Sequence, residues 1–342
     1  MYREYMEETL SSLLKIDSPS GFTHEVVAMA EKIAGEMGYE TKRKRRGGLC
    51  ITVEGRDCSK SVACFAHVDT VGLILRDVTE NGELMVSKIG GPVLPSVEGE
   101  YCRIHTRSGK VYTGTVLSLS PSSHVFSDSG TRIRDEENMY VRLDEPVFSK
   151  EDVWALGIDR GDVIAVDPKL VITESGYIKS RYLDDKASAA MLLTVLKKMK
   201  TEKLMPRYRT YIVLTEYEEV GSGGAWQPEG IEEFLIVDMG CVGPGLGCTE
   251  QQVSICAKDS SGPYDYEMVS RLVSLSREKG IDYAVDVYPH YSSDAAVAWK
   301  SGCDAPGALI GTGVHASHGM ERTHRDGMKN TFELICAYLD LA

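Results

Sequence analysis

The chain has 342 residues, of which 42% are hydrophobic, and its 38 lysines and arginines against 51 aspartates and glutamates leave a formal net charge of −13 at pH 7. This length exceeds the usual size of a single core, so we expect one large domain or two unequal ones. The acidic balance argues against a general affinity for nucleic acid or anionic membranes, and it leaves peptides and small molecules as the expected ligands.

Cysteine usage and the N-terminal residues indicate the compartment. Nine cysteines occur without any Cys-x-x-Cys pair, and the odd number fits reduced, buried thiols rather than a disulfide framework. Residues 1–8 are charged where a signal peptide needs an apolar core, and no apolar run approaches the roughly 20 residues of a membrane span. We therefore expect a soluble, cytoplasmic protein that does not enter a membrane.

The N-terminal part of the chain predicts two helices followed by two strands. Apolar residues recur at helical spacing over residues 10–14 and 26–37, on either side of a Ser-Pro-Ser-Gly loop at 18–21. The basic run 42–46 is expected to be a solvated strand edge or an oligomer contact rather than a nucleic-acid patch. Strands are predicted at 49–53 and 61–66, and the second is almost continuously apolar, as in a buried central strand.

The pattern changes over the next hundred residues or so. From about Gly72 to Val166 short alternating segments are separated by turn signals, such as Glu80-Asn81-Gly82-Glu83, and no convincing amphipathic helix occurs. We expect a small β-barrel-like domain, residues 72–166, inserted into a domain made of residues 1–71 and 167–342.

The α/β pattern then returns. The predicted elements are a helix at 186–198, strands at 211–214, 234–237 and 253–257, and helices near 264–279 and 330–341. Strands that alternate with helices predict the α/β class, with a mixed sheet covered by helices and interrupted by the insert.

Acidic residues and a histidine lie at the ends of these core segments. His67 and Asp69 follow one apolar strand, the Glu218-Glu219 pair follows a second, Asp238 ends a third, and Asp184-Asp185 precedes a helix. Open α/β sheets form their ligand sites at the carboxyl ends of strands, so these groups are expected to converge. Imidazole and carboxylate suit zinc, cobalt or manganese, and two neighbouring cations need a carboxylate that bridges them.

Each of these groups alone has a plainer interpretation. His67 could be a hydrogen-bonded core histidine, Asp238 or Asp184-Asp185 a helix cap, and the glutamate pair a solvated loop. Four groups with such unrelated roles would not each need to adjoin an apolar core segment. Their common position therefore favours a metal site.

The chain resembles a known family along almost its whole length: the TET-type dinuclear metallo-aminopeptidases, in the clan of co-catalytic zinc exopeptidases. The resemblance rests on the order and spacing of several motifs: His67-Val68-Asp69, Leu183-Asp184-Asp185-Lys186, Glu218-Glu219-Val220-Gly221 with Gly224 following, Val237-Asp238, Ser293-Asp294-Ala295-Ala296 and the histidines near His318. It implies the phosphorylase/hydrolase-like fold of zinc exopeptidases.

The resemblance also implies residue roles. His67, Asp184 and Asp238 would hold one divalent metal, and Asp184, Glu219 and a C-terminal histidine would hold a second; zinc or cobalt is expected, and manganese also suits. Glu218 would be the general base that deprotonates a water bridging the metals, and Asp69 would orient His67. The implied reaction is release of N-terminal residues from peptides, by a homo-oligomer between a dimer and a tetrahedral dodecamer, with the insert as a lid or dimerisation domain.

Three histidines compete for the last metal position. The terminal loop, residues 314–324, contains His315, His318 and His324. We choose His318 because its spacing to Glu321 and to the final helix matches the family best. His315 is the reserve, and His324 is expected at the helix start or in a substrate pocket.

Two other functions stay open at this point. A di-metal carboxypeptidase or deacylase of the same clan would prefer a free carboxylate or a blocked amine in its substrate. A metal-stabilised oligomeric scaffold would lack catalysis, but Glu218 has no obvious structural duty if Glu219 is the ligand, which favours an enzyme.

Overall fold

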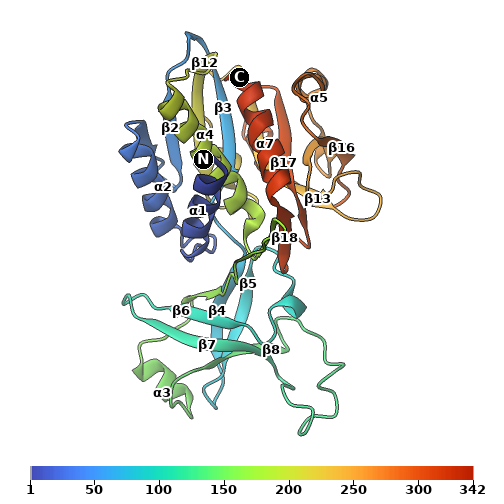
Figure 1. Ribbon diagram of the computed structural model, residues 1–342. Helices are drawn as coiled ribbons and strands as arrows, with labels where there is room; N and C mark the ends of the chain where they lie inside the picture. The colour runs from blue at the N-terminus through green and yellow to red at the C-terminus, as the bar shows by residue number, and fades with distance from the viewer. Residues whose placement is uncertain (1, 342) are drawn as a thin grey trace. The chain divides into compact units, whose positions relative to one another are not determined.

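The computed structural model describes residues 2–341, and they form two compact units. Unit 1 comprises residues 2–69 and 169–341, and unit 2 comprises the segment Thr70–Pro168 between them (Figure 1). Each unit has a hydrophobic core of its own. The expected role of unit 2 as a lid or dimerisation domain stays a prediction. Within residues 2–341 no helix combines the length and the apolar character needed to cross a membrane.

Unit 1 is built on one mixed β-sheet. Its strands in chain order are β1 (Glu40–Arg43), β2 (Leu49–Val53), β3 (Asp57–His67), β10 (Val171–Ile172), β11 (Tyr177–Ser180), β12 (Tyr208–Thr215), β13 (Glu233–Val242), β14 (Val253–Asp259), β15 (Gly262–Pro263), β16 (Tyr283–Val287), β17 (Gly307–His315) and β18 (Glu321–His324). Their order across the sheet is β1-β2-β12-β3-β13-β17-β18-β11-β10, and β14 joins β15 and β16 to β17.

Four neighbouring strands in the middle of this sheet run parallel. β12 pairs with β3, β3 with β13, and β13 with β17, all in parallel register. Residues 62–66 of β3 and 212–215 of β12 are buried, as expected for strands covered on both faces. Because parallel strands all end at the same edge of the sheet, the residues that follow these strands are brought to one place.

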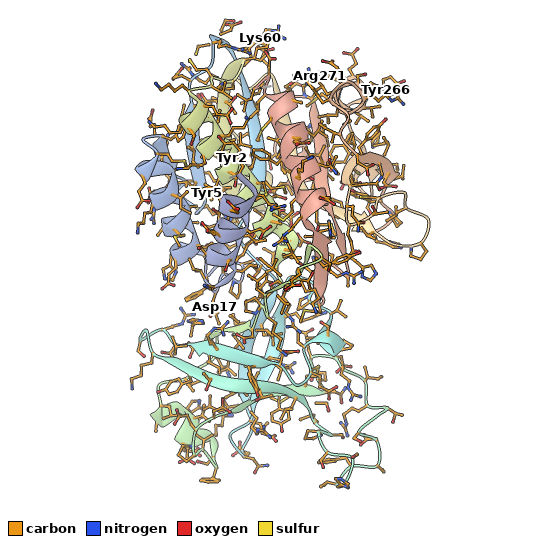
Figure 2. The ribbon with its side chains drawn as sticks, viewed as in Figure 1. Tyr2, Tyr5, Asp17, Lys60, Tyr266 and Arg271 are labelled. Atoms are coloured by element: carbon orange, nitrogen blue, oxygen red, sulfur yellow. The ribbon has the colours of Figure 1, made fainter. Side chains whose placement is uncertain are left out.

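Seven α-helices and two short 3₁₀-helices occur in the described residues. In unit 1 they are α1 (Tyr2–Leu14), α2 (His24–Glu36), α4 (Leu183–Glu202), α5 (Tyr266–Lys279), α6 (Asp294–Lys300), α7 (Arg325–Tyr338) and the 3₁₀-helix η2 (Gly223–Ala225). Every residue of α4 from Leu183 to Leu196 is buried, so this helix is packed on all sides. Tyr2 and Tyr5 of α1 lie beside it (Figure 2), with Lys198 and Lys197 over their rings.

Unit 2 is a closed antiparallel barrel. Its strands β4 (Gly72–Val78), β5 (Leu84–Ile89), β6 (Tyr101–His105), β7 (Val111–Ser118), β8 (Met139–Leu143) and β9 (Val163–Val166) close in the order β4-β5-β8-β7-β6-β9. Alternate apolar side chains fill the interior. The unit also contains the 3₁₀-helix η1 (Leu94–Ser96) and the short helix α3 (Lys150–Ala155), which the sequence pattern did not predict. The predicted fold class, a helix-flanked mixed α/β sheet with a small barrel, is confirmed.

Two details of the sheet differ from the expectations. Asp238 does not end its strand, because β13 continues to Val242. The strand β17 was not predicted, because its glycines at 307, 311 and 313 have low strand propensity. Gly311 is required by a close approach: a Cβ atom at this position would lie 2.1 Å from the carbonyl oxygen of Asp238. The absence of a side chain thus lets β17 pair with β13 beside Asp238.

Replacing Gly311 by alanine is expected to push these two strands apart. We expect the free energy of unfolding in urea to fall by about 1–3 kcal/mol, as for other overpacked core positions. The control is Gly35→Ala in α2, where an added Cβ meets no atom within 4 Å; helix propensity should leave that variant unchanged or up to about 1 kcal/mol more stable. Equal unfolding midpoints for the two variants would contradict this account of Gly311.

Candidate metal centre

The parallel strands of unit 1 bring the candidate ligands together. His67 is the last residue of β3 and is paired with Thr215, the last residue of β12, so that Glu218 and Glu219 follow at the same edge. The β3–β13 register stops at Phe65 and Ile236, so Asp238 lies two residues beyond the last pair, as His67 does. His318 follows β17, and the first turn of α4 contributes Asp184.

The first group of possible ligands is formed by His67, Asp184 and Asp238, all of them buried. One ligand atom from each lies within 4.8 Å of the others. The Nε2 atom of His67 is 3.1 Å from Oδ1 of Asp184. Its Nδ1 atom lies 3.0 Å from the carbonyl oxygen of Asp69, which can only accept a hydrogen bond, so Nδ1 carries a proton. This leaves Nε2 as the nitrogen directed at Asp184.

The second group shares Asp184 with the first. Asp184, Glu219 and His318 again offer ligand atoms within 4.8 Å of one another. The Nε2 atom of His318 is 3.2 Å from Oε2 of Glu219 and 3.6 Å from Oδ2 of Asp184. Asp184 therefore presents one carboxylate oxygen to each imidazole, which is the arrangement a bridging carboxylate requires.

Asp69 and Glu218 lie beside these groups. Oε2 of Glu218 is 3.8 Å from Nε2 of His67. The amide of Glu218 donates a 3.2 Å hydrogen bond to Oδ1 of Asp69, while the Ser20 hydroxyl donates to Oδ2. The Asp69 carboxylate is also 3.5 Å from Nδ1 of His67. One buried carboxylate thus fixes both the imidazole and the backbone that carries Glu218.

The buried carboxyl and imidazole groups of this cluster are shielded from water, and this loss of solvation shifts their pKa values. Burial raises the pKa of Glu218 well above its usual range and raises the pKa of Glu219. Burial, followed by the charge of Asp184, raises the pKa of Asp238 to about 7. Burial lowers the pKa of His67, but the carboxylates of Asp184 and Asp69 more than compensate, and the net pKa is well above the ordinary value. The site thus favours positive charge at its centre.

The other two histidines of the terminal loop have different surroundings. His315 is exposed at the end of β17 and belongs to neither ligand group. His324 is the N-cap of α7, where its Nδ1 accepts a hydrogen bond from the amide of Asp326. This position agrees with the expected helix start.

Comparison with known proteins places the chain in a family. The model of the M42 glutamyl aminopeptidases matches residues 47–334, which is most of the chain. The chain belongs to the M42 family. It is therefore a hydrolase of the exopeptidase class, and the resemblance to TET-type aminopeptidases is confirmed.

Individual M42 relatives and neighbours agree with this placement. The chain is 45% identical over 333 residues to the "Putative aminopeptidase YhfE" of Bacillus subtilis (strain 168), covering 97% of this chain and 96% of that protein. Its fold matches the aminopeptidase APDkam598 of Desulfurococcus kamchatkensis with a TM-score of 0.89, at 21% identity and 100% and 96% coverage. The Pyrococcus horikoshii TET1 peptidase matches with a TM-score of 0.85, at 20% identity and 98% and 99% coverage.

Two buried carboxylates that received no role from the sequence position this M42 site. Glu321 accepts hydrogen bonds of 3.0 Å from the amides of Asp184 and His318. It therefore holds the backbone of two members of the second ligand group. Asp294 accepts from the Thr215 hydroxyl and from the amide of Gly224, both at 2.6 Å. The only signals in the sequence were the Ser-Asp-Ala-Ala motif around Asp294 and the spacing of Glu321 from His318, since the hydrogen bonds to Asp184, Thr215 and Gly224 join segments far apart in the chain.

Glycines follow Glu219 because Asp294 lies against the backbone there. A Cβ at Gly224 would lie 2.1 Å from the carbonyl oxygen of Asp294, and one at Gly223 would lie 2.7 Å from its carboxylate. The hydroxyl of Tyr291 is buried near the Asp238 carboxylate. Burial, followed by the charge of Asp238, raises its pKa well above the ordinary range.

The raised pKa values predict how the stability of metal-free protein depends on pH. A carboxyl whose pKa is raised on folding binds more protons in the folded than in the unfolded chain, so its contribution to stability is lost as pH rises. For Asp238 this loss spans the range from 3.8 to about 7, and for Asp294 from 3.8 to about 6. We expect the urea midpoint of chelator-treated protein to fall between pH 5.5 and pH 7.5, and saturating Zn²⁺ to abolish the fall. A midpoint that rises over this range without metal would contradict the assignment.

Proposed function

We propose that the protein is a metal-dependent aminopeptidase with two divalent cations per subunit. His67, Asp184 and Asp238 would hold one cation, and Asp184, Glu219 and His318 the other. The observation that carries this proposal is the pair of ligand groups that meet at Asp184, beside the carboxylate of Glu218. The donors are imidazole nitrogens and carboxylate oxygens, which suit zinc, cobalt or manganese.

The charge balance of the site supports the same proposal. Among the described residues, the carboxyl groups of Asp69, Asp184, Glu218, Glu219 and Asp238 lie around the two imidazoles of His67 and His318. Like charges buried so close together cannot all ionise without a compensating positive charge. Divalent cations supply that charge and replace the protons that the raised pKa values favour.

Glu218 is the residue we assign to proton transfer. When bound, the two cations would acidify a water molecule and polarise the carbonyl of the scissile peptide bond. Oε2 of Glu218 would accept a proton from the attacking water and later return it to the departing amine. Burial raises the pKa of Glu218, which favours a carboxylate that readily accepts a proton from water. Asp69 keeps Glu218 in place through its amide and keeps the Nδ1 proton of His67 in position.

We further propose that the protein works as a homo-oligomer. The Pyrococcus horikoshii TET1 peptidase, whose fold this chain shares, can assemble into a tetrahedron or a large octahedral shell. The segment Thr70–Pro168 forms a unit with a complete core of its own and would be free to take part in such contacts.

Replacement of Glu218 by glutamine tests the proposed general base. We expect kcat on aminoacyl p-nitroanilides to fall by about 10²–10⁴-fold, because the amide cannot accept the proton, while two metals stay bound. Glu219→Gln is the matched control and should lose bound metal, since its carboxylate is a proposed ligand. Unchanged kcat in Glu218→Gln would overturn the assignment. Comparing free with N-acetylated peptides on the wild type distinguishes an aminopeptidase from a deacylase.

Alanine replacements of the loop histidines test the last ligand. His318→Ala is expected to lower the metal content measured by elemental analysis from two ions toward one, because the second group loses its only imidazole. His315→Ala should retain both ions, because the exposed side chain of His315 belongs to neither group. Two bound metals in His318→Ala, or one in His315→Ala, would show that the assignment of this ligand is wrong.

A further inference from the structure

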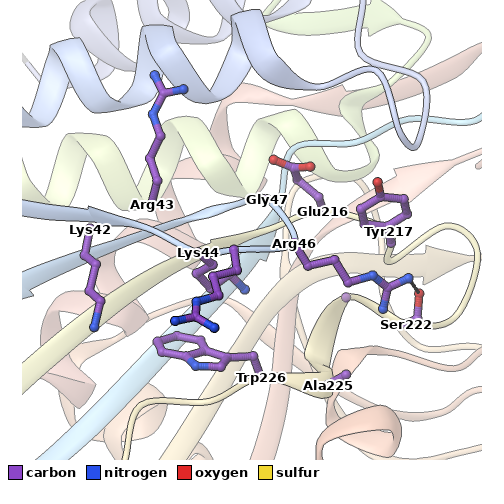
Figure 3. A pocket seen from close by; sticks show the side chains of 12 residues that line it. Lys42, Arg43, Lys44, Arg46, Gly47, Glu216, Tyr217, Ser222, Ala225 and Trp226 are labelled. Carbon is purple, nitrogen blue, oxygen red and sulfur yellow. Dashed lines mark hydrogen bonds between the residues drawn. The ribbon is translucent and has the colours of Figure 1, made fainter.

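A hollow of unit 1 is lined in part by the loop between β12 and η2, which also carries Glu218 and Glu219. Its volume is about 390 Å³, and it is lined by the basic run 42–46 with Gly47 and by Glu216, Tyr217, Ser222, Gly223, Ala225 and Trp226 (Figure 3). We call it the basic groove. It shares no residue with the two ligand groups of the metal centre. Its size is within the range of small-molecule and peptide pockets.

The cations of the basic groove are concentrated by the strand that supplies them. Side chains alternate along β1 and the turn after it, so Arg43 points toward α2, whereas Lys42 and Lys44 point the other way (Figure 3). Arg43 is paired with Glu31 of α2 at 2.7 Å. In residues 2–341, Lys42, Lys44 and Arg45 form no salt bridge. Glu216 is the one carboxylate among the residues that line the hollow, so in a chain with a net charge of −13 the lining keeps an excess of positive charge.

Aromatic side chains hold two of these cations in place. The Lys44 ammonium lies 5.0 Å from the ring centroid of Trp226, and the Arg46 guanidinium lies 4.6 Å from that of Tyr217. Arg46 also donates a 3.0 Å hydrogen bond to the Ser222 hydroxyl. Such contacts restrain long side chains, so less conformational entropy is lost when an anion binds them.

The opposite wall of the groove belongs to the catalytic loop. Glu216 lines the groove and accepts a hydrogen bond from the amide of Gly48. Glu218, two residues later, points toward His67 instead. Tyr217 lies between them with a positive φ of 67°, which turns the backbone so that the two glutamates face different sites. The basic groove and the metal centre are therefore on two sides of one short loop.

We propose that the basic groove binds acidic side chains of a peptide substrate, downstream of the residue whose bond is cleaved. This inference rests on the proposed aminopeptidase function. The first residue of a substrate must lie at Glu218 and the ligand groups, so a separate site behind the same loop reaches only residues further along the peptide. The lysine and arginine side chains of the groove are hydrogen-bond donors with positive charge, which suits carboxylates. A strand edge that only faced solvent would not need a concave site of this size.

Binding to metal-free protein tests the groove without catalysis. The probes are the amidated peptides Leu-Ala-Glu-Glu-Glu and Leu-Ala-Gln-Gln-Gln, and the signal is quenching of Trp226 fluorescence, assigned with the Trp226→Phe variant. We expect the glutamate peptide to bind at least about tenfold more tightly at low salt, and this preference to fall in 0.5 M NaCl. Equal affinities of the two peptides would overturn the proposal.

A charge-matched pair of variants locates the site. In Lys42→Gln/Arg45→Gln the preference for the glutamate peptide should fall below about threefold, because two exposed cations of the groove are gone. Lys60→Gln/Lys279→Gln removes two exposed cations elsewhere, at the start of β3 (Lys60, Figure 2) and at the end of α5, and should keep the full preference. Equal losses in the two variants would contradict a local site.

Three further outcomes would also overturn the proposal or separate it from the function on which it rests. Binding of tripolyphosphate without binding of the glutamate peptide would indicate a site for free anions. A changed oligomeric state of Lys42→Gln/Arg45→Gln in light scattering, with unchanged peptide binding, would indicate a subunit contact. With metal restored, we expect kcat/KM to favour the glutamate peptide in the wild type and in Lys60→Gln/Lys279→Gln, but not in Lys42→Gln/Arg45→Gln. If neither peptide is cleaved, the proposed aminopeptidase function is wrong. The binding measured on metal-free protein still shows whether the basic groove binds acidic side chains.

Discussion

Repulsion among buried carboxylates is the constraint on which the centre of unit 1 depends. Asp184 presents its two oxygens to His67 and His318, at 3.1 and 3.6 Å, and Glu218 and Asp238 crowd the same space. The charged forms lose water on burial, so Glu218 and Asp238 favour their protonated forms unless positive charge takes the place of the protons. Folding of the apoprotein and the proposed binding of cations would therefore be linked: the sheet holds the carboxylates close, and cations would relieve the repulsion that this closeness creates.

A large part of this arrangement could be predicted from the sequence because it obeys short-range rules. Buried parallel strands are continuous apolar runs, and β3 and β12 were recognised in that way. Polar residues directly after such runs belong to the carboxyl edge of a sheet, which is where His67 and the Glu218-Glu219 pair lie. The position of Asp184 between both ligand groups, in contrast, was implied by the family resemblance, because a helix start carries no information about which two side chains it will lie between.

The parts that the sequence did not reveal depend on contacts between distant segments. The strand β17 was missed since its glycines are poor strand formers, yet Gly311 is there to let two backbones meet beside Asp238. Glu321 and Asp294 hold backbone amides far from them in the chain, and their function follows from hydrogen bonds alone. The basic run was expected at a strand edge, and β1 is indeed an edge strand, but the hollow that its cations line with Trp226 is a product of tertiary structure.

Asp69 has a consequence for how the two units can be separated or exchanged. It is the last residue of unit 1 before the chain enters the barrel, and it also fixes His67 and the amide of Glu218. The junction thus adjoins the candidate metal centre rather than lying in a neutral linker. A domain graft that keeps the peptidase core but replaces the barrel must preserve Asp69 and its backbone direction, so recombination between relatives is constrained more strictly at this junction than its position between two compact units would suggest.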